Sequence, residues 1–68
     1  MTPQEIQQHS ESIAKMIVTD LRDRRGLSQA WDSIDADIQQ EIRETWTLMA
    51  RAGLESALRI AANRSPAN

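Results

Sequence analysis

Apolar residues recur every three or four positions through the first third of the chain. Placed at about 100° per residue, four of them gather within about 80° of one another: Ile6, Ile13, Ile17 and Leu21. Polar residues occupy the opposite side. Before this pattern, Thr2 is placed as an N-cap, Pro3 as the first helical residue and Glu5 as the partner in a capping box. The pattern therefore predicts an amphipathic helix over residues 3–24.

The segment DLRDRRGLSQAWDS joins this helix to the next one. Arg24 and Arg25 are expected in the last helical turn, where cations complement the helix dipole, and Gly26 is placed to cap it. A short helical turn over 28–33 then carries Trp31. The three arginines of the segment therefore fit the end of a helix.

A second amphipathic pattern predicts a long helix over residues 36–63. Four apolar residues cluster within about 40° on it: Ile38, Ile42, Met49 and Ile60. Small and apolar neighbours widen this sector to about 160°, which is more than one shorter helix covers. The remaining residues, 64–68, are expected to fray.

The uncovered part of that sector favours self-association. Gly53, Ala57 and Ala61 are spaced four apart, which lets a second backbone approach closely. A glycine in mid-helix costs about 1 kcal/mol relative to alanine, and close packing would compensate for it. The alternative is that Gly53 is only tolerated or marks a kink.

We therefore expect an all-α fold: a helical hairpin of two long antiparallel helices with a short helical turn between them. Two such hairpins are expected to dimerise into a four-helix arrangement. The expected interface residues are Met49, Gly53, Ala57, Ile60 and Ala61.

Composition narrows the chemistry further. A 68-residue chain forms one domain with a marginal core, since chains of this size bury only about 60% of their unfolded surface. There is no cysteine and His9 is the one histidine, so we expect no disulfide, no metal and no cofactor. The acids between positions 32 and 44 fit helix capping and a solvated face. No catalytic constellation stands out, and we expect no enzyme activity.

Charge and hydropathy bear on the partners. The net charge of −2 and the acids in the first turns of the second helix disfavour nucleic acid as a partner. No apolar run approaches the length of about 20 residues that a membrane span needs, so no membrane insertion is expected. The lack of an export signal and of cysteine fits a cytoplasmic location.

Protein binding remains as the main function class. Tryptophan and arginine are frequent interface anchors, which makes Trp31, Trp46, Arg24 and Arg25 candidate contact residues. Leu48 falls among charged residues on the helix surface, where no core of the same chain reaches. For the two tryptophans the alternative is a structural role, because the chain has no other aromatic residue to fill its core.

The stretches DLRDRRGL and AWDSIDADIQQEIRETW, within residues 10–52, resemble small phage-encoded proteins, most of all the phage quorum-sensing anti-activator family. The resemblance implies a helical dimer made early in infection that binds host proteins, namely a LuxR-type transcription activator and a pilus-assembly ATPase. It points to Trp46 and the start of the second helix as partner contacts, and then to Arg24 and Arg25.

The expected function is accordingly a phage-encoded module that binds and inhibits a host bacterial protein in the host cytoplasm. Two alternatives stay open. One is a small helix-turn-helix-like regulator that binds DNA, and the other is a structural or virion-assembly protein.

Overall fold

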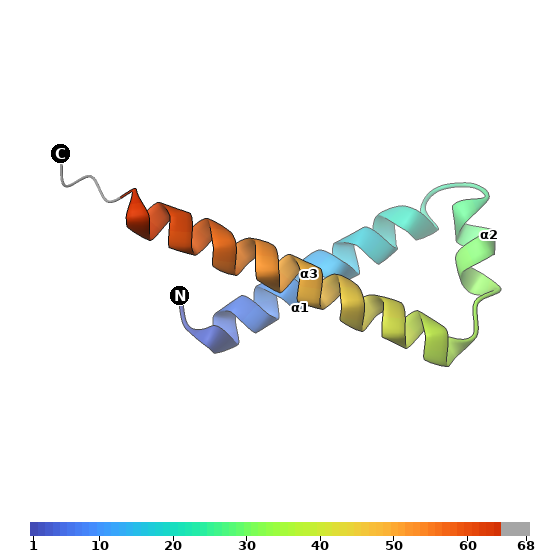
Figure 1. Ribbon diagram of the computed structural model, residues 1–68. Helices are drawn as coiled ribbons and strands as arrows, with labels where there is room; N and C mark the ends of the chain where they lie inside the picture. The colour runs from blue at the N-terminus through green and yellow to red at the C-terminus, as the bar shows by residue number, and fades with distance from the viewer. Residues whose placement is uncertain (65–68) are drawn as a thin grey trace.

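The computed structural model describes residues 1–64, which form three helices and no strand (Figure 1). They are α1 (Pro3–Arg22), α2 (Leu27–Asp32) and α3 (Ala36–Asn63). The prediction of two long helices that pack together, with a short helical segment between them, is confirmed. The expected fraying of the tail concerns residues beyond Arg64, which lie outside the described residues.

The capping box at the start of α1 is present. The Thr2 hydroxyl accepts from the Glu5 backbone N–H at 3.1 Å, and the Glu5 carboxylate accepts from the Thr2 N–H at 2.8 Å. Hydrogen bonds from the backbone and the hydroxyl of Thr2 hold the pKa of Glu5 below its ordinary value. The local sequence therefore fixes where α1 begins.

The end of α1 differs from the prediction. The last helical residue is Arg22 with Asp23 as C-cap, whereas Gly26, at φ 83°, precedes α2 as its N-cap. The Asp23 N–H bonds to the carbonyls three and four residues earlier, and the next N–H bonds only three residues back, to Leu21. The last turn tightens and the chain leaves the helix before Arg24. Placing Arg24 and Arg25 in the last turn, with Gly26 as its cap, was therefore wrong.

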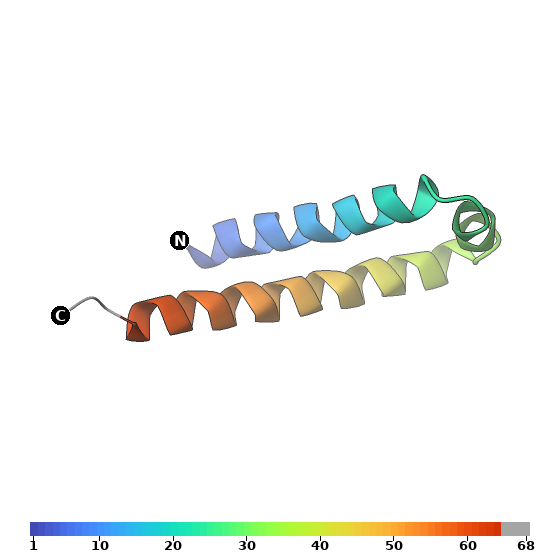
Figure 2. The ribbon, with the colours of Figure 1, turned by 90° about the horizontal axis from the view of Figure 1, so that it is seen from above.

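Helices α1 and α3 run in opposite directions and cross each other, while α2 closes one end of the pair (Figures 1 and 2). Ile6, Ser10 and Ala14 are the buried residues of α1 and are spaced four apart, so they form one stripe along it. The fully buried Ser10 hydroxyl donates to the Ile6 carbonyl at 2.7 Å, which satisfies it within its own helix. Small side chains in this stripe allow the two helices to approach closely.

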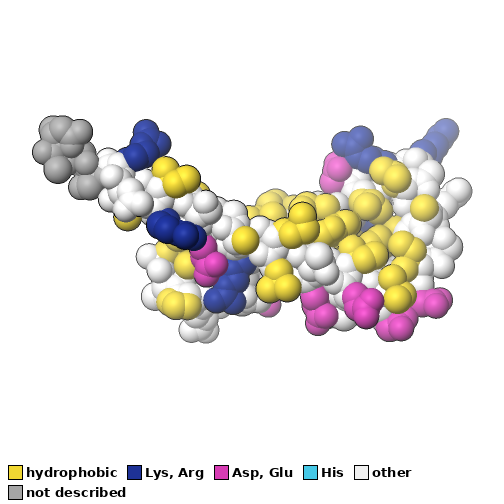
Figure 3. Space-filling model, in the orientation of Figure 1, with side chains coloured by type: hydrophobic (Ala, Val, Ile, Leu, Met, Phe, Trp, Pro, Cys, Tyr) yellow, Lys and Arg dark blue, Asp and Glu magenta, His cyan; other side chains and the backbone are white. Residues whose placement is uncertain are grey.

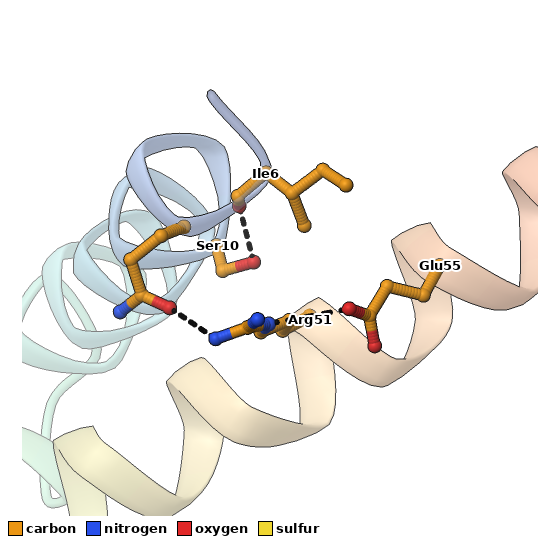
Figure 4. Close-up of polar contacts among 5 residues, drawn as sticks. Ile6, Ser10, Arg51 and Glu55 are labelled. Carbon is orange, nitrogen blue, oxygen red and sulfur yellow. Dashed lines mark hydrogen bonds and ion pairs between the residues drawn. The ribbon is translucent and has the colours of Figure 1, made fainter. Parts of the chain in front are cut away.

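A polar contact ties the two long helices together beside this stripe. Arg51 on α3 donates to the Gln7 side-chain oxygen at 3.1 Å and pairs with Glu55 at 3.3 Å (Figure 4). The Arg51 guanidinium is half-buried, which makes such a charge-assisted bond stronger than one in open water. The Arg51–Gln7 bond is the one side-chain hydrogen bond between α1 and α3 within residues 1–64.

The core of this fold is small. Ile6, Ala14 and Trp31 are the buried hydrophobic residues of the described chain, and α3 contributes none. The molecule measures 53 × 22 × 13 Å with a radius of gyration of 15.5 Å, whereas a compact chain of 68 residues has about 11 Å. Much of the apolar sector of α3 is therefore left on the surface.

Candidate functional site

Two tryptophans fix the closed end of the hairpin. Trp31 on α2 stacks on Trp46 of α3, with ring centroids 5.9 Å apart and planes 20° apart. The Arg43 guanidinium lies 5.9 Å from the Trp31 ring centroid, and the Gln39 side-chain amide donates to the Trp31 carbonyl at 2.7 Å. Aromatic stacking and a cation–π contact thus hold α2 against the first turns of α3.

The exposure of the two rings separates their roles. Trp31 is only 4% exposed, so its ring leaves little surface for a partner. Trp46 is half-buried and keeps part of its surface open. Of the two tryptophans that the sequence predicted as contact residues, only Trp46 therefore has side-chain surface that a partner could contact.

Arg24 and Arg25 lie in the exposed loop between α1 and α2. The Arg24 guanidinium bonds to the Asp20 carboxylate at 2.9 Å, and this hydrogen bond and charge raise the pKa of Arg24. Part of its hydrogen-bonding capacity is therefore used within the chain. Arg25 forms no ion pair within residues 1–64.

The residues predicted to form a dimer interface lie together on one exposed side of α3, here called the α3 stripe: Met49, Gly53, Ala57, Ile60 and Ala61. Two of them are large apolar side chains with more than half of their surface in solvent. Figure 3 shows hydrophobic side chains gathered across the middle of the molecule and over its α2 end, whereas charged side chains interrupt them toward the C-terminal end of α3. Exposed apolar surface of this kind is typical of an interaction surface.

Gly53 has no role that its own chain explains. A Cβ added to it meets nothing within 4 Å, and its φ is not positive. Neither close packing against α1 nor backbone conformation therefore requires a glycine there. The single chain would therefore accommodate a larger residue at this position.

Leu48, directly before the stripe, faces a different side of α3. It lines a groove of about 820 Å³ between α1 and α3. Ala14 and Val18 of α1 and Thr47 of α3 also line it, and charged side chains from both helices surround them. The sequence marked Leu48 as out of place but not this groove, because its walls come from two helices whose crossing no single-helix pattern reveals.

The described residues hold little that is typical of catalysis. Residues 1–64 contain no group of three or more metal-ligating side chains, and His9 is exposed. Ser10 is the only buried polar residue among them. None of the three helices is both long and apolar enough to cross a membrane.

Comparison with known proteins adds no relative. No protein-family model, curated protein or solved structure matches the chain.

Proposed function

We propose that this chain is a homodimeric protein-binding module that inhibits a target protein by covering its functional surface, and that it is not an enzyme. The observation that carries the proposal is the amount of surface that the single chain leaves exposed. It exposes 5418 Å², whereas a compact monomer of 7.7 kDa exposes about 4,300 Å². The surplus of about 1,100 Å² exceeds the roughly 800 Å² that each partner buries in a standard protein–protein interface.

The α3 stripe is the proposed dimer interface. Its exposed Met49 and Ile60 supply apolar area, and Gly53 lets the α3 helices of two copies approach closely. A symmetric contact of this kind yields a four-helix arrangement, which covers the same residues of both copies.

The target is proposed to be a host bacterial protein, bound in the host cytoplasm. The resemblance to the phage quorum-sensing anti-activator family supports a LuxR-type transcription activator, a pilus-assembly ATPase, or both. Leu48, Arg24 and Arg25 are proposed contact residues that are exposed outside the α3 stripe. Trp46 is the fourth proposed contact residue; it is half-buried and lies on the same side of α3 as the stripe. No cofactor is part of this mechanism, because inhibition needs only occupation of a surface.

Sedimentation velocity tests the dimer with a matched pair of variants. Leu48 and Met49 are neighbours with 65% and 64% exposure, but only Met49 belongs to the α3 stripe. Met49→Glu should give a monomer at micromolar concentration, because each of the two chains would then bury a carboxylate in the apolar contact between them. Leu48→Glu should remain a dimer. A wild-type protein that sediments as a monomer would refute the interface.

A separate experiment tests inhibition. Purified chain is titrated against a purified LuxR-type activator and a pilus-assembly ATPase by calorimetry, followed by a promoter reporter in bacterial cells. Binding to either protein and loss of its activity would support the proposal. Absence of binding to both, combined with a salt-sensitive shift of duplex DNA at sub-micromolar protein, would replace it with a DNA-binding role.

A further inference from the structure

The groove between α1 and α3 has an uneven balance of charge. Two carboxylates and three cations line it: Glu11, Glu44, Lys15, Arg22 and Arg43. The lining thus carries a net charge of +1, from three positive and two negative groups, in a chain whose net charge is −2. The lining is therefore slightly positive on an acidic protein, although Asp32, 3.9 Å from Arg22, offsets one of its cations.

The two carboxylates are already engaged within their own helices. Glu11 accepts from the Gln7 amide at 3.2 Å, and Glu44 accepts from the Gln40 amide at 3.3 Å. Each glutamine stands one turn before its acid, so these bonds hold the carboxylates along the helix surface. Their hydrogen-bonding capacity toward a ligand is reduced.

The three cations keep most of their donors. Lys15 forms no ion pair within residues 1–64, and the Arg22–Asp32 pair is long, at 3.9 Å. Arg43 lies over the Trp31 ring and donates one long bond of 3.5 Å to Gln40. Stacking on a tryptophan orients this guanidinium while its N–H groups remain able to bind an anion.

The groove also has apolar lining: Ala14 and Val18 from α1 and the exposed Leu48 from α3, beside the polar side chains of Gln7, Thr19, Gln40 and Thr47. It has a volume of about 820 Å³ and is partly open to solvent. An open groove lined by both apolar and charged side chains fits a ridge of side chains on a partner helix. An enclosed pocket would be expected for a small molecule.

We propose that this groove binds an acidic amphipathic helix of the target protein. Apolar side chains of that helix lie on Val18 and Leu48, and its carboxylates pair with Lys15, Arg22 and Arg43. The proposal rests on the proposed protein-binding function but not on the dimer, because the groove and the α3 stripe occupy different sides of α3. It assigns Leu48 its role and adds Lys15 and Arg43 to the partner-binding residues.

The test uses two fluorescein-labelled helical peptides and the full chain, with binding measured by fluorescence anisotropy. The first peptide has leucines at i, i+4 and i+7 flanked by glutamates, and the second has lysine in place of every glutamate. The acidic peptide should bind at least about ten-fold more tightly than the basic one, and its affinity should fall as salt rises. Equal binding of the two peptides, or no binding of the acidic one, would overturn the proposal.

Variants place the binding on the chain. Lys15→Glu and Leu48→Glu should each weaken binding of the acidic peptide about ten-fold. Arg59→Glu is the matched control: it makes the same change of charge as Lys15→Glu, on an exposed residue that does not line the groove. Apart from the long-range effect of net charge, its affinity for the acidic peptide should stay within about two-fold of wild type. Lys15→Gln serves as a milder variant, and circular dichroism checks that each variant stays helical. Unchanged binding by Lys15→Glu would refute the assignment.

Backbone amide shifts in a nitrogen-15 spectrum give a readout independent of affinity. Titration with the acidic peptide should move the signals of Ala14, Val18 and Thr47, and shifts confined to the α3 stripe would contradict the groove. The groove and the proposed inhibitory function can fail separately. If the peptide binds the groove while neither candidate target binds the chain, the inhibitory function fails and the groove stands.

Discussion

Replacement of Gly53 by alanine should act in opposite directions on the single chain and on the dimer. Within the chain the new methyl group meets nothing within 4 Å, so it adds no clash. Alanine is favoured over glycine in a helix interior by about 1 kcal/mol. For a domain of this size, that gain raises the melting temperature by about 4–8 °C.

At a close contact between two α3 helices, the same substitution adds one methyl group from each copy. Overpacking of this kind costs about 1–3 kcal/mol, which corresponds to a rise of roughly 5- to 150-fold in the dissociation constant of the dimer. The two effects are separable because the first needs only one chain. Gly53→Ala is therefore expected to give a more stable monomer and a weaker dimer.

Two measurements make the comparison. Sedimentation equilibrium gives the dissociation constant of wild type and of Gly53→Ala, and thermal unfolding in the Met49→Glu background gives the stability of the single chain. A Gly53→Ala protein that dimerises as tightly as wild type would refute the close approach at this residue. A loss of stability in the Met49→Glu background would refute the finding that its surroundings are open.

Three further predictions concern the fold. Trp31→Ala should cost about 3–5 kcal/mol in urea unfolding, because it removes a buried ring and its stacking on Trp46, and a loss below about 1 kcal/mol would contradict the packing described. Thr2→Ala should cost about 1 kcal/mol in the same assay through loss of the N-cap, with Thr45→Ala, an exposed position inside α3, as the comparison. The pKa of Glu5 is lowered in the folded chain, so its contribution to stability is present above its unfolded value of about 4.3 and is lost as pH falls through the folded value. Carboxyl titration by NMR should show this low pKa in wild type and only a partial return toward the ordinary value in Thr2→Ala, because the backbone N–H of residue 2, whose hydrogen bond is the larger cause, remains.

The helices themselves follow from the sequence because their causes are local. The spacing of Ile13, Ile17 and Leu21 and the Thr2–Glu5 capping box predict α1, and the apolar period after Asp35 predicts α3. The end of α1 was misplaced because cations and a following glycine are compatible with more than one last turn. The choice between these turns depends on how the chain must bend to bring α2 across the hairpin.

Burial was decided by the tertiary structure. Ile6, Ser10 and Ala14 of α1 are buried, whereas Ile13 is only half-buried and Ile17 is exposed, although both belong to the same apolar sector as Ile6. Close approach of two helices favours small side chains at their crossing point, so a serine is more deeply buried than an isoleucine in the same helix. Hydrophobicity along a single helix does not contain this information.

The candidate surfaces divide in the same way. The α3 stripe was predictable, since an apolar sector wider than one neighbour can cover shows in the period of a single helix. For Trp31 the sequence left a structural role and a partner contact both open, and the groove around Leu48 was not predictable, because burial of the ring and the groove are each formed by side chains from separate helices. The sequence by itself determined which segments are helical and that α3 carries surplus apolar surface. The crossing of α1 and α3 determined which residues are buried and where the groove lies. Burial and the groove depend on distances between residues far apart in the chain, which the pattern along one helix does not contain.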